Sequence, residues 1–383
     1  MQKITRLGMA VATALATAAV CTPSVSAAAR GGDDGHDSSG HHAVFVQTDD
    51  PAGNQIIAYR RAENGRLTQA KTYDTDGLGG VLAGSVADHL ASQGSLTYDP
   101  RHALLYAVNA GSDTVSVFSV DGDRLALRQV VGSGGRFPVS VAVHDDDVYV
   151  LNALDGGSIQ GYTIHGGRLR EQAGWNRDLG LDPNATPQFT NTPGQVGFTG
   201  DGSQLVVTTK ANGSNLLVFN LDRSGAPADS PVTTNLPGAV PFAFVPNGSH
   251  GLFLAEAGTN AVATFTIHRD GTASQEAYAA TGQSATCWIV AARNLLYASN
   301  AGSSTLSGFR TSDHGRRLTP LGNTPTHPGT VDAATTPDGH YLYAQTGVNG
   351  IVDEFAVNGD GSLTALGSRT VPGGVGGEGI VAP

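Results

Sequence analysis

Residues 104–118 read Leu-Leu-Tyr-Ala-Val-Asn-Ala-Gly-Ser-Asp-Thr-Val-Ser-Val-Phe, and residues 295–309 repeat this phrase as Leu-Leu-Tyr-Ala-Ser-Asn-Ala-Gly-Ser-Ser-Thr-Leu-Ser-Gly-Phe. An apolar stretch with an aromatic centre, a glycine-containing turn and a second alternating stretch are typical of two antiparallel strands joined by a hairpin. Weaker copies bring the total to seven. They are centred on Phe45, Tyr106, Tyr149, Val207, Phe253, Tyr297 and Tyr343.

The spacing of these copies indicates the fold. Most intervals measure 43 to 46 residues, and two measure 61 and 58. Self-similarity at this period, with four short strands per unit, indicates a β-propeller. In residues 138–174, alternating segments at 139–143, 148–151, 158–164 and 169–172 are separated by turn-forming residues. We therefore predict an all-β fold, a seven-bladed β-propeller of four-stranded antiparallel blades over residues 43–383.

The two ends of this domain complement each other. The first unit begins at Ala43 and lacks an inner strand, while residues 375–383 resemble the inner-strand openings at 241–246 and 328–333. A sheet with a missing strand exposes an edge that must be covered. We expect the C-terminal strand to close the N-terminal blade and lock the ring without a disulfide.

The N-terminal residues predict export. Lys3 and Arg6 precede an apolar stretch at 7–20, and small-residue cleavage sites follow near Ala27 to Ala29, so residues 1–29 are predicted to be a signal peptide. That stretch is too short for a comfortable membrane span, and we expect a secreted, extracellular protein without one. Residues 30–42 are expected to be a flexible leader. Their histidines and aspartates could bind a metal weakly or form a solvated tail; we predict no cofactor and no metal.

Composition limits the class of partner. The formal net charge is −11, and loss of Lys3 and Arg6 with the signal peptide leaves −13. This acidity disfavours nucleic acid and anionic membranes, so we expect a small-molecule ligand or a cell-surface component, and a monomer. Cleavage would also remove Cys21 and leave Cys287, beside Trp288, as the only thiol. A lone cysteine in an apolar run is more typical of a buried side chain than of a nucleophile. The preference for arginine over lysine suggests a bacterial source.

Candidate site residues follow from blade geometry. Loops after the second strand of each blade and loops before each inner strand share one face, where ligand sites of such rings form. Lys210 and Glu256 stand at equivalent positions of adjacent blades, and they are either a catalytic acid–base pair or an inter-blade ion pair. Asn109, Asn152 and Asn300 are the equivalent candidates for substrate binding, although asparagine there can also cap its own turn.

The loops before the inner strands add Arg136 and His327, and His327 is the best-placed titratable base. Two connections, 74–94 and 174–192, are longer than the fold requires, and long loops in compact domains are commonly functional. The second carries Trp175 and Arg177, which suit a ligand-contacting flap, although an insertion can equally be neutral. Common hydrolase and paired-cysteine metal motifs are missing from the sequence.

The repeated phrase at 104–118, the turn at 335–343 and the Asp-Gly-Ser-Leu hairpin at 360–363 resemble the lactonase family of seven-bladed propellers, and YVTN-type repeats share much of the same phrase. That family includes 6-phosphogluconolactonases and carboxymuconate lactonising enzymes. Family members typically carry Pro-Arg-His and Pro-His-x-His at two inner strands. This chain has Pro-Phe-Ala at 241–243 and Pro-Gly-Gln-Val at 193–196, which argues against a sugar-phosphate lactone.

The resemblance implies a lactone hydrolase that acts on a small polar lactone or cyclic ester at the central funnel. In the mechanism that we expect from the sequence, His327 activates water, Lys210 and Arg136 stabilise the oxyanion, and Glu256 orients them. The alternative is a noncatalytic extracellular or cell-surface binding propeller. Convergence of the four side chains in one pocket would support catalysis, and scattered side chains would support binding alone.

Overall fold

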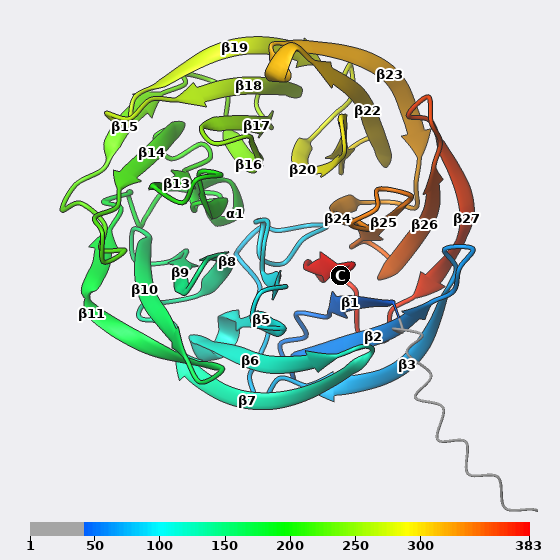
Figure 1. Cartoon of the computed structure of the whole chain (residues 1–383), viewed down its shortest axis with the longest axis horizontal. Coiled ribbons are helices and arrows are strands. Elements are labelled where there is room, and N and C mark those ends of the chain that lie inside the picture. Colours follow the sequence, from blue (N-terminus) through cyan, green and yellow to red (C-terminus); the bar gives the residue numbers. More distant parts are fainter. Residues whose placement is uncertain (1–41) are drawn as a thin grey trace, which may run out of the picture. The chain divides into compact units, whose positions relative to one another are not determined.

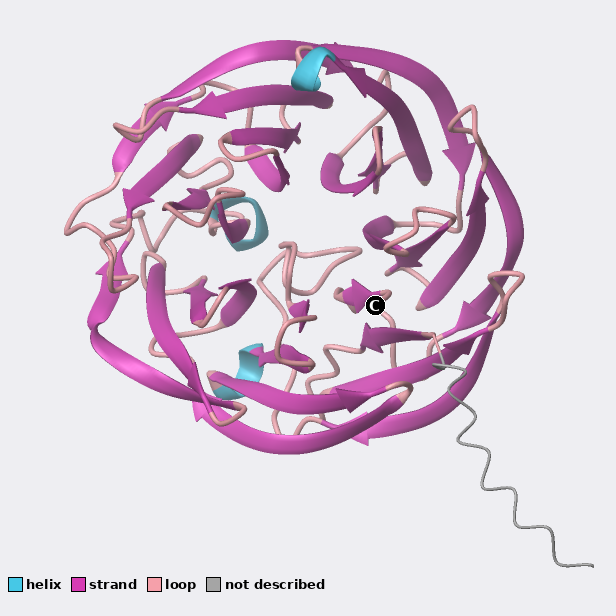
Figure 2. Cartoon of the chain, viewed as in Figure 1, coloured by secondary structure: helices cyan, strands magenta, loops and turns pink. Residues whose placement is uncertain are grey.

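The computed structural model describes residues 42–383, most of which lie in strands and tight turns (Figure 2). The predicted signal peptide and residues 30–41 of the predicted leader lie outside the described residues. Within the described part the helical segments are three short turns: η1 (Ala110–Ser112), α1 (Gln188–Asn191) and η2 (Asp313–Gly315). No helix in residues 42–383 has the length and apolar character needed to cross a membrane.

The strands form seven four-stranded antiparallel sheets arranged as a ring of blades (Figure 1). Blade 1 contains β28 (Ile380–Val381), β1 (Ala43–Gln47), β2 (Gln55–Arg61) and β3 (Leu67–Asp74), and blade 2 contains β4 (Leu96–Asp99), β5 (Leu104–Asn109), β6 (Thr114–Asp121) and β7 (Arg124–Gly132). Blade 3 contains β8 (Pro138–His144), β9 (Asp147–Asn152), β10 (Ser158–His165) and β11 (Arg168–Asp178), and blade 4 contains β12 (Gln195–Phe198), β13 (Gln204–Thr208), β14 (Asn215–Asn220) and β15 (Val232–Asn235). Blade 5 contains β16 (Pro241–Asn247), β17 (Gly251–Glu256), β18 (Ala261–Ile267) and β19 (Ala273–Ala280), and blade 6 contains β20 (Thr286–Ala292), β21 (Leu295–Asn300), β22 (Thr305–Ser312) and β23 (Arg317–Pro325). Blade 7 contains β24 (Thr330–Thr335), β25 (Tyr341–Thr346), β26 (Ile351–Val357) and β27 (Leu363–Thr370).

Burial explains why the repeated phrase is so apolar. All six residues of β5 are buried, whereas the outer strand β7 of the same blade is mostly exposed. Neighbouring blades cover both faces of the second strand, so this strand is a continuous apolar run, while the outer strand borders solvent. The predicted seven-bladed, four-stranded architecture is confirmed.

The tyrosine anchors of the repeat link successive blades. The hydroxyls of Tyr149, Tyr297 and Tyr343 each donate a hydrogen bond to the carbonyl of a glycine in the outer hairpin of the next blade, at 2.6, 2.9 and 2.7 Å. The acceptors are Gly225, Gly361 and Gly65, which all have positive φ. A buried hydroxyl normally needs such a partner, so these three tyrosines also align the adjacent blade, whereas the buried hydroxyl of the anchor Tyr106 has no partner within the described residues.

The C-terminus closes the ring, as the sequence predicted. β28 pairs antiparallel with β1 through Val46 and Ile380, and completes blade 1 as its innermost strand. The amide of Glu378 donates to Asp49 at 2.7 Å, and the amide of Ile380 donates to Asp332 at 3.3 Å. The last residues are thus held by blade 1 and, through Asp332, by blade 7.

The connection between β3 and β4, residues 75–95, crosses the middle of the ring and is called the central plug below (Figure 1). Its Ser92 hydroxyl donates to Val139 of blade 3, its Ser92 carbonyl accepts from the Trp288 indole of blade 6, and its Ala91 carbonyl accepts from Lys210 of blade 4. The plug therefore ties blades on opposite sides of the ring together.

The second long connection is shorter than predicted. β11 continues to Asp178, so Trp175 and Arg177 lie in an outer strand and not in a loop. The placement of these two residues in a flap was wrong. The alternation of apolar and polar residues ends near residue 172, but the outer strand of blade 3 continues beyond it to Asp178. The connection itself runs from 179 to 194 and contains α1.

Candidate functional site

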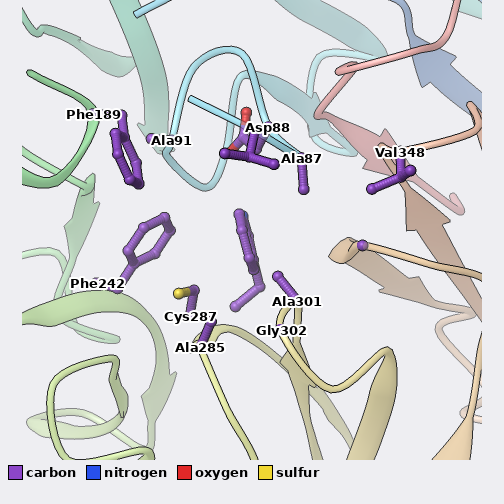
Figure 3. A pocket seen from close by; sticks show the side chains of 13 residues that line it. Ala87, Asp88, Ala91, Phe189, Phe242, Ala285, Cys287, Ala301, Gly302 and Val348 are labelled. Atoms are coloured by element: carbon purple, nitrogen blue, oxygen red, sulfur yellow. The ribbon is translucent and has the colours of Figure 1, made fainter. Parts of the chain in front are cut away.

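An apolar cavity of about 260 Å³ opens beside the central plug, on the face where the sequence placed a ligand site. Figure 3 shows that the rings of Phe189 and Phe242 lie together on one side, with Asp88 and Val348 on others. The full lining is Val86, Ala87, Asp88, Ala91, Phe189, Phe242, Ala285, Cys287, Trp288, Ala301, Gly302, Gly329 and Val348.

Distant segments assemble this cavity. The plug supplies Val86, Ala87, Asp88 and Ala91, α1 supplies Phe189, β16 supplies Phe242, and β20 supplies Cys287 and Trp288. The rings of Phe242 and Trp288 lie 4.9 Å apart at 59°, an arrangement that stabilises aromatic pairs. Loops before β20 and β24 and after β21 and β25 supply the remaining lining, so blades 5, 6 and 7 share the site with the plug.

Asp88 is the single charged residue of the lining, and it is 3 % exposed. Its carboxylate accepts the amides of Leu90 at 2.7 Å and Ser92 at 3.0 Å, which fixes the turn of the plug. Burial raises the pKa of Asp88 to about 6, although these hydrogen bonds and the positive charge of Lys210 oppose the rise. A carboxyl group with such a pKa can exchange a proton near neutral pH.

Lys210 lies behind the cavity wall and is 1 % exposed. Its ammonium donates to the carbonyls of Ala91 and Phe189, both at 2.6 Å, and to the Thr192 hydroxyl at 3.1 Å. Burial lowers the pKa of this amine to about 7, while the charge of Asp88 raises it. The amine lies 5.3 Å from the centroid of the Phe242 ring, within the distance at which a cation is attracted to an aromatic face.

Three further carboxyl groups are buried near the axis: Asp49, Asp332 and Glu378. Burial raises the pKa of Asp49 to about 8 and that of Asp332 to about 7, and burial together with the neighbouring acids raises the pKa of Glu378. Both side-chain oxygens of Glu378 lack a hydrogen-bond partner in the described structure. Within residues 42–383, no three histidine, cysteine or acidic side chains are grouped as a metal site.

Glu378→Gln is expected to stabilise the protein at alkaline pH. The folded chain holds a proton on Glu378, whose pKa is raised, whereas the unfolded chain releases it above pH 4.5. The contribution of this group to the free energy of unfolding is therefore fully present below that pH. It falls by about 1.4 kcal/mol for each unit of rising pH until the pKa of the folded state is reached. Glutamine keeps the shape and removes this proton uptake, so the variant should be more stable than the wild type at pH 8, and the difference should be smaller at pH 5.

Urea unfolding at pH 5 and pH 8 measures this effect, with Glu63→Gln on the surface as the matched control. A Glu378→Gln variant that is no more stable than the wild type at pH 8 would contradict the interpretation of Glu378 as a buried, protonated group.

The four residues expected to be catalytic do not line the cavity, and within residues 42–383 no hydrogen bond or ion pair joins any two of them. The exposed Arg136 faces Asp155 at 3.5 Å. His327 is half exposed, and its Nδ1 lies 2.6 Å from Asp353. Glu256 accepts a hydrogen bond from Thr259 at 2.8 Å, and burial raises its pKa. Of the four, Lys210 alone has a contact with the cavity wall.

The candidate binding residues are occupied by internal contacts. Asn109 and Asn300 are fully buried and donate to hydroxyls of the strand that follows them, Ser116 and Ser307, both at 2.9 Å. Asn152 is also fully buried and donates to the Ser133 carbonyl.

The two candidates on β11 are likewise engaged. Trp175 stacks on Tyr149 with centroids 5.8 Å apart, and Arg177 donates to carbonyls and to Asp229 of blade 4. The structure thus places all five candidate binding residues outside the lining of the cavity.

The comparisons with known proteins agree with this architecture. A family model described as "Lactonase, 7-bladed beta-propeller" matches residues 82–376. The chain belongs to this lactonase family. The match begins within the central plug and ends within the C-terminal segment, so it includes every element that lines the cavity.

Solved structures similar to this lactonase-family protein include a putative 6-phosphogluconolactonase from Bacteroides fragilis, with a TM-score of 0.71 and 18% identity over 91% of this chain and 99% of that one. A periplasmic gluconolactonase from Pseudomonas aeruginosa aligns with a TM-score of 0.69 and 16% identity over 88% and 98% of the two chains. At these identities the likeness shows the fold. No curated protein sequence matches the chain significantly.

Sequence reasoning missed Asp88, Phe242 and the role of Trp288 as cavity wall. The signal that pointed towards Asp88 was the length of the 74–94 connection, which identified the segment but not the side chain. Phe242 stands where the family motif that the chain resembles has arginine, so the departure at that position marked a cavity residue.

Proposed function

We propose that this protein is a lactone hydrolase whose site is the cavity beside the central plug. Membership of the lactonase family supports the reaction class, and the observation that carries the site is a buried carboxylate, Asp88, in the wall of an otherwise apolar cavity. In this proposal Asp88 accepts a proton from the water that attacks the lactone carbonyl. The charge of Lys210, 5.3 Å behind the Phe242 ring, lowers the energy of the oxyanion that forms.

Water exclusion supports the same assignment. Asp88 is 3 % exposed, and aromatic and small apolar side chains make up the rest of the lining. Charges act more strongly in such a low-dielectric site than in water, so one base and one nearby cation can have a large effect. Export as a released extracellular protein remains part of the proposal, on the basis of residues 1–29.

Asp88→Asn is expected to lower kcat by at least about 100-fold, because general-base catalysis typically contributes this much or more. A panel of lactones, followed by release of acid at constant pH, measures the loss. Asp76→Asn changes an exposed carboxylate of the same plug and serves as the matched control. A large loss in His327→Ala or Glu256→Gln with none in Asp88→Asn would favour the mechanism expected from the sequence.

The pH dependence gives a second readout of the same prediction. Activity should rise as Asp88 ionises, with its pKa at about 6, and fall as Lys210 loses its proton, with its pKa at about 7. The plot of kcat/KM against pH should therefore be a narrow bell, and its two limbs should report the apparent pKa values of the coupled pair Asp88 and Lys210. An activity that keeps rising above pH 8 would exclude a role for the Lys210 charge.

The second candidate function is ligand binding without turnover. Its specific support is that the polar residues expected to react are scattered over separate blades and engaged in local contacts. A folded protein that binds lactones in the cavity but hydrolyses none of the panel would establish this function instead.

A further inference from the structure

We infer that the cavity takes an uncharged ligand with an apolar chain or ring, so that its substrate class is a lipophilic lactone and not a sugar lactone or its phosphate. The reaction in this statement rests on the proposed function, but the binding preference does not. It stands on the lining of the cavity and on the surface around its mouth.

The size of the cavity suits an apolar group. An apolar cavity of about 150 Å³ is enough to stay dry and bind benzene, and this one measures about 260 Å³. Phe189, Phe242 and Trp288 provide three aromatic faces, and small residues such as Ala87 and Ala301 leave the space open between them (Figure 3). A chain or ring larger than benzene therefore fits without displacing the walls.

The charges of the site disfavour anions and sugars. The single charged residue in the lining is Asp88, which is acidic. The nearest cation, Lys210, already donates to three protein oxygens behind the wall and has no donor left for a phosphate. A sugar needs several hydrogen-bond partners, and hydroxyls buried against these side chains would lose their bonds to water.

Exposed apolar residues gather on the same face. Val86 and Val348 belong to the lining and are 82 % and 42 % exposed. Val375 is 60 % exposed. Its backbone lies against Gly350, in the loop that carries Val348, because a Cβ added to Gly350 would come within 2.9 Å of the Val375 amide nitrogen. Large apolar side chains in a group at a cavity mouth mark a binding site more often than single ones do. Val86 and Val348 extend the apolar lining of the cavity to the surface, which accommodates the end of a chain.

Binding of N-phenyl-1-naphthylamine, an uncharged probe that fluoresces in apolar surroundings, tests this inference without requiring turnover. We expect saturable binding to the full chain, displaced by γ-nonalactone at a concentration at least tenfold lower than γ-butyrolactone. Glucose 6-phosphate should not displace the probe.

Val348→Asp should weaken probe binding at least tenfold, because it places a charge at the mouth. Val130→Asp is the matched control, a similarly exposed valine on the outer strand β7, and it should change binding less than twofold. Both sites are exposed, so both variants should melt like the wild type.

Absence of saturable binding, equal effects of the two substitutions, or displacement by glucose 6-phosphate would each overturn the inference. Its failure differs from failure of the proposed function. Probe binding without hydrolysis of any lactone rejects the hydrolase alone, and hydrolysis of polar lactones without probe binding rejects the lipophilic ligand alone.

Discussion

A chain that ends at Gly377 is expected to lose the cooperative fold of the whole ring. The deletion removes β28, so β1 becomes an unpaired inner edge at the axis. It also removes Ile380, which is 3 % exposed and packs with Val46 and Tyr343. Loss of one such side chain from a core costs about 2–5 kcal/mol, before the lost backbone hydrogen bonds are added.

The buried carboxyl groups increase this cost. Asp49 and Asp332 accept the amides of Glu378 and Ile380 in the intact chain, and the truncation removes both of these donors. The total should exceed about 5 kcal/mol, which is a large part of the stability of an ordinary domain.

Urea unfolding followed by circular dichroism measures the effect of the truncation. The matched control is a chain that ends at Ala382, which lacks Pro383 alone and keeps every residue of β28. If the chain ending at Gly377 unfolds at the urea concentration of the full chain, the ring does not depend on its C-terminal strand.

Trp288→Ala should lose both stability and ligand binding. Trp288 is 4 % exposed, contacts the Phe242 ring and donates its indole N–H to the Ser92 carbonyl of the plug at 2.5 Å. Removal of a buried tryptophan costs about 3–5 kcal/mol. It also takes away one wall of the cavity and one attachment of the plug that carries Asp88, so probe binding and lactone hydrolysis should fall at least tenfold.

The other described tryptophan provides the control. Trp175 is 8 % exposed and stacks on Tyr149 in blade 3, and it does not line the cavity. Trp175→Ala should reduce the free energy of unfolding by a similar amount but leave probe binding unchanged. Equal loss of binding in both variants would show that binding follows global stability and not the wall of this cavity.

For the candidate residues, the sequence predicted the face of the ring but not the contacts of the side chains. The positions after each anchor were correctly assigned to one face, and the cavity does open on that face. At Asn109 and Asn300, however, the side chains are buried and donate to hydroxyls of the following strand, whereas the structural role expected from the sequence was a cap of the asparagine's own turn. The ammonium group of Lys210 points inward, where it donates hydrogen bonds to the carbonyls of Ala91 in the plug and Phe189 in α1.

The amino-acid sequence by itself determined the blades, their number and the C-terminal closure. These features depend on the alternation of apolar residues and on turn chemistry, which are local and recur seven times. Only the tertiary structure decided the site. Its walls come from the plug, α1 and three blades, and the 75–95 segment carries no repeat that would predict its position. Asp88 becomes a buried carboxylate with a raised pKa because seven packed blades enclose that segment, and burial of this kind depends on the whole ring.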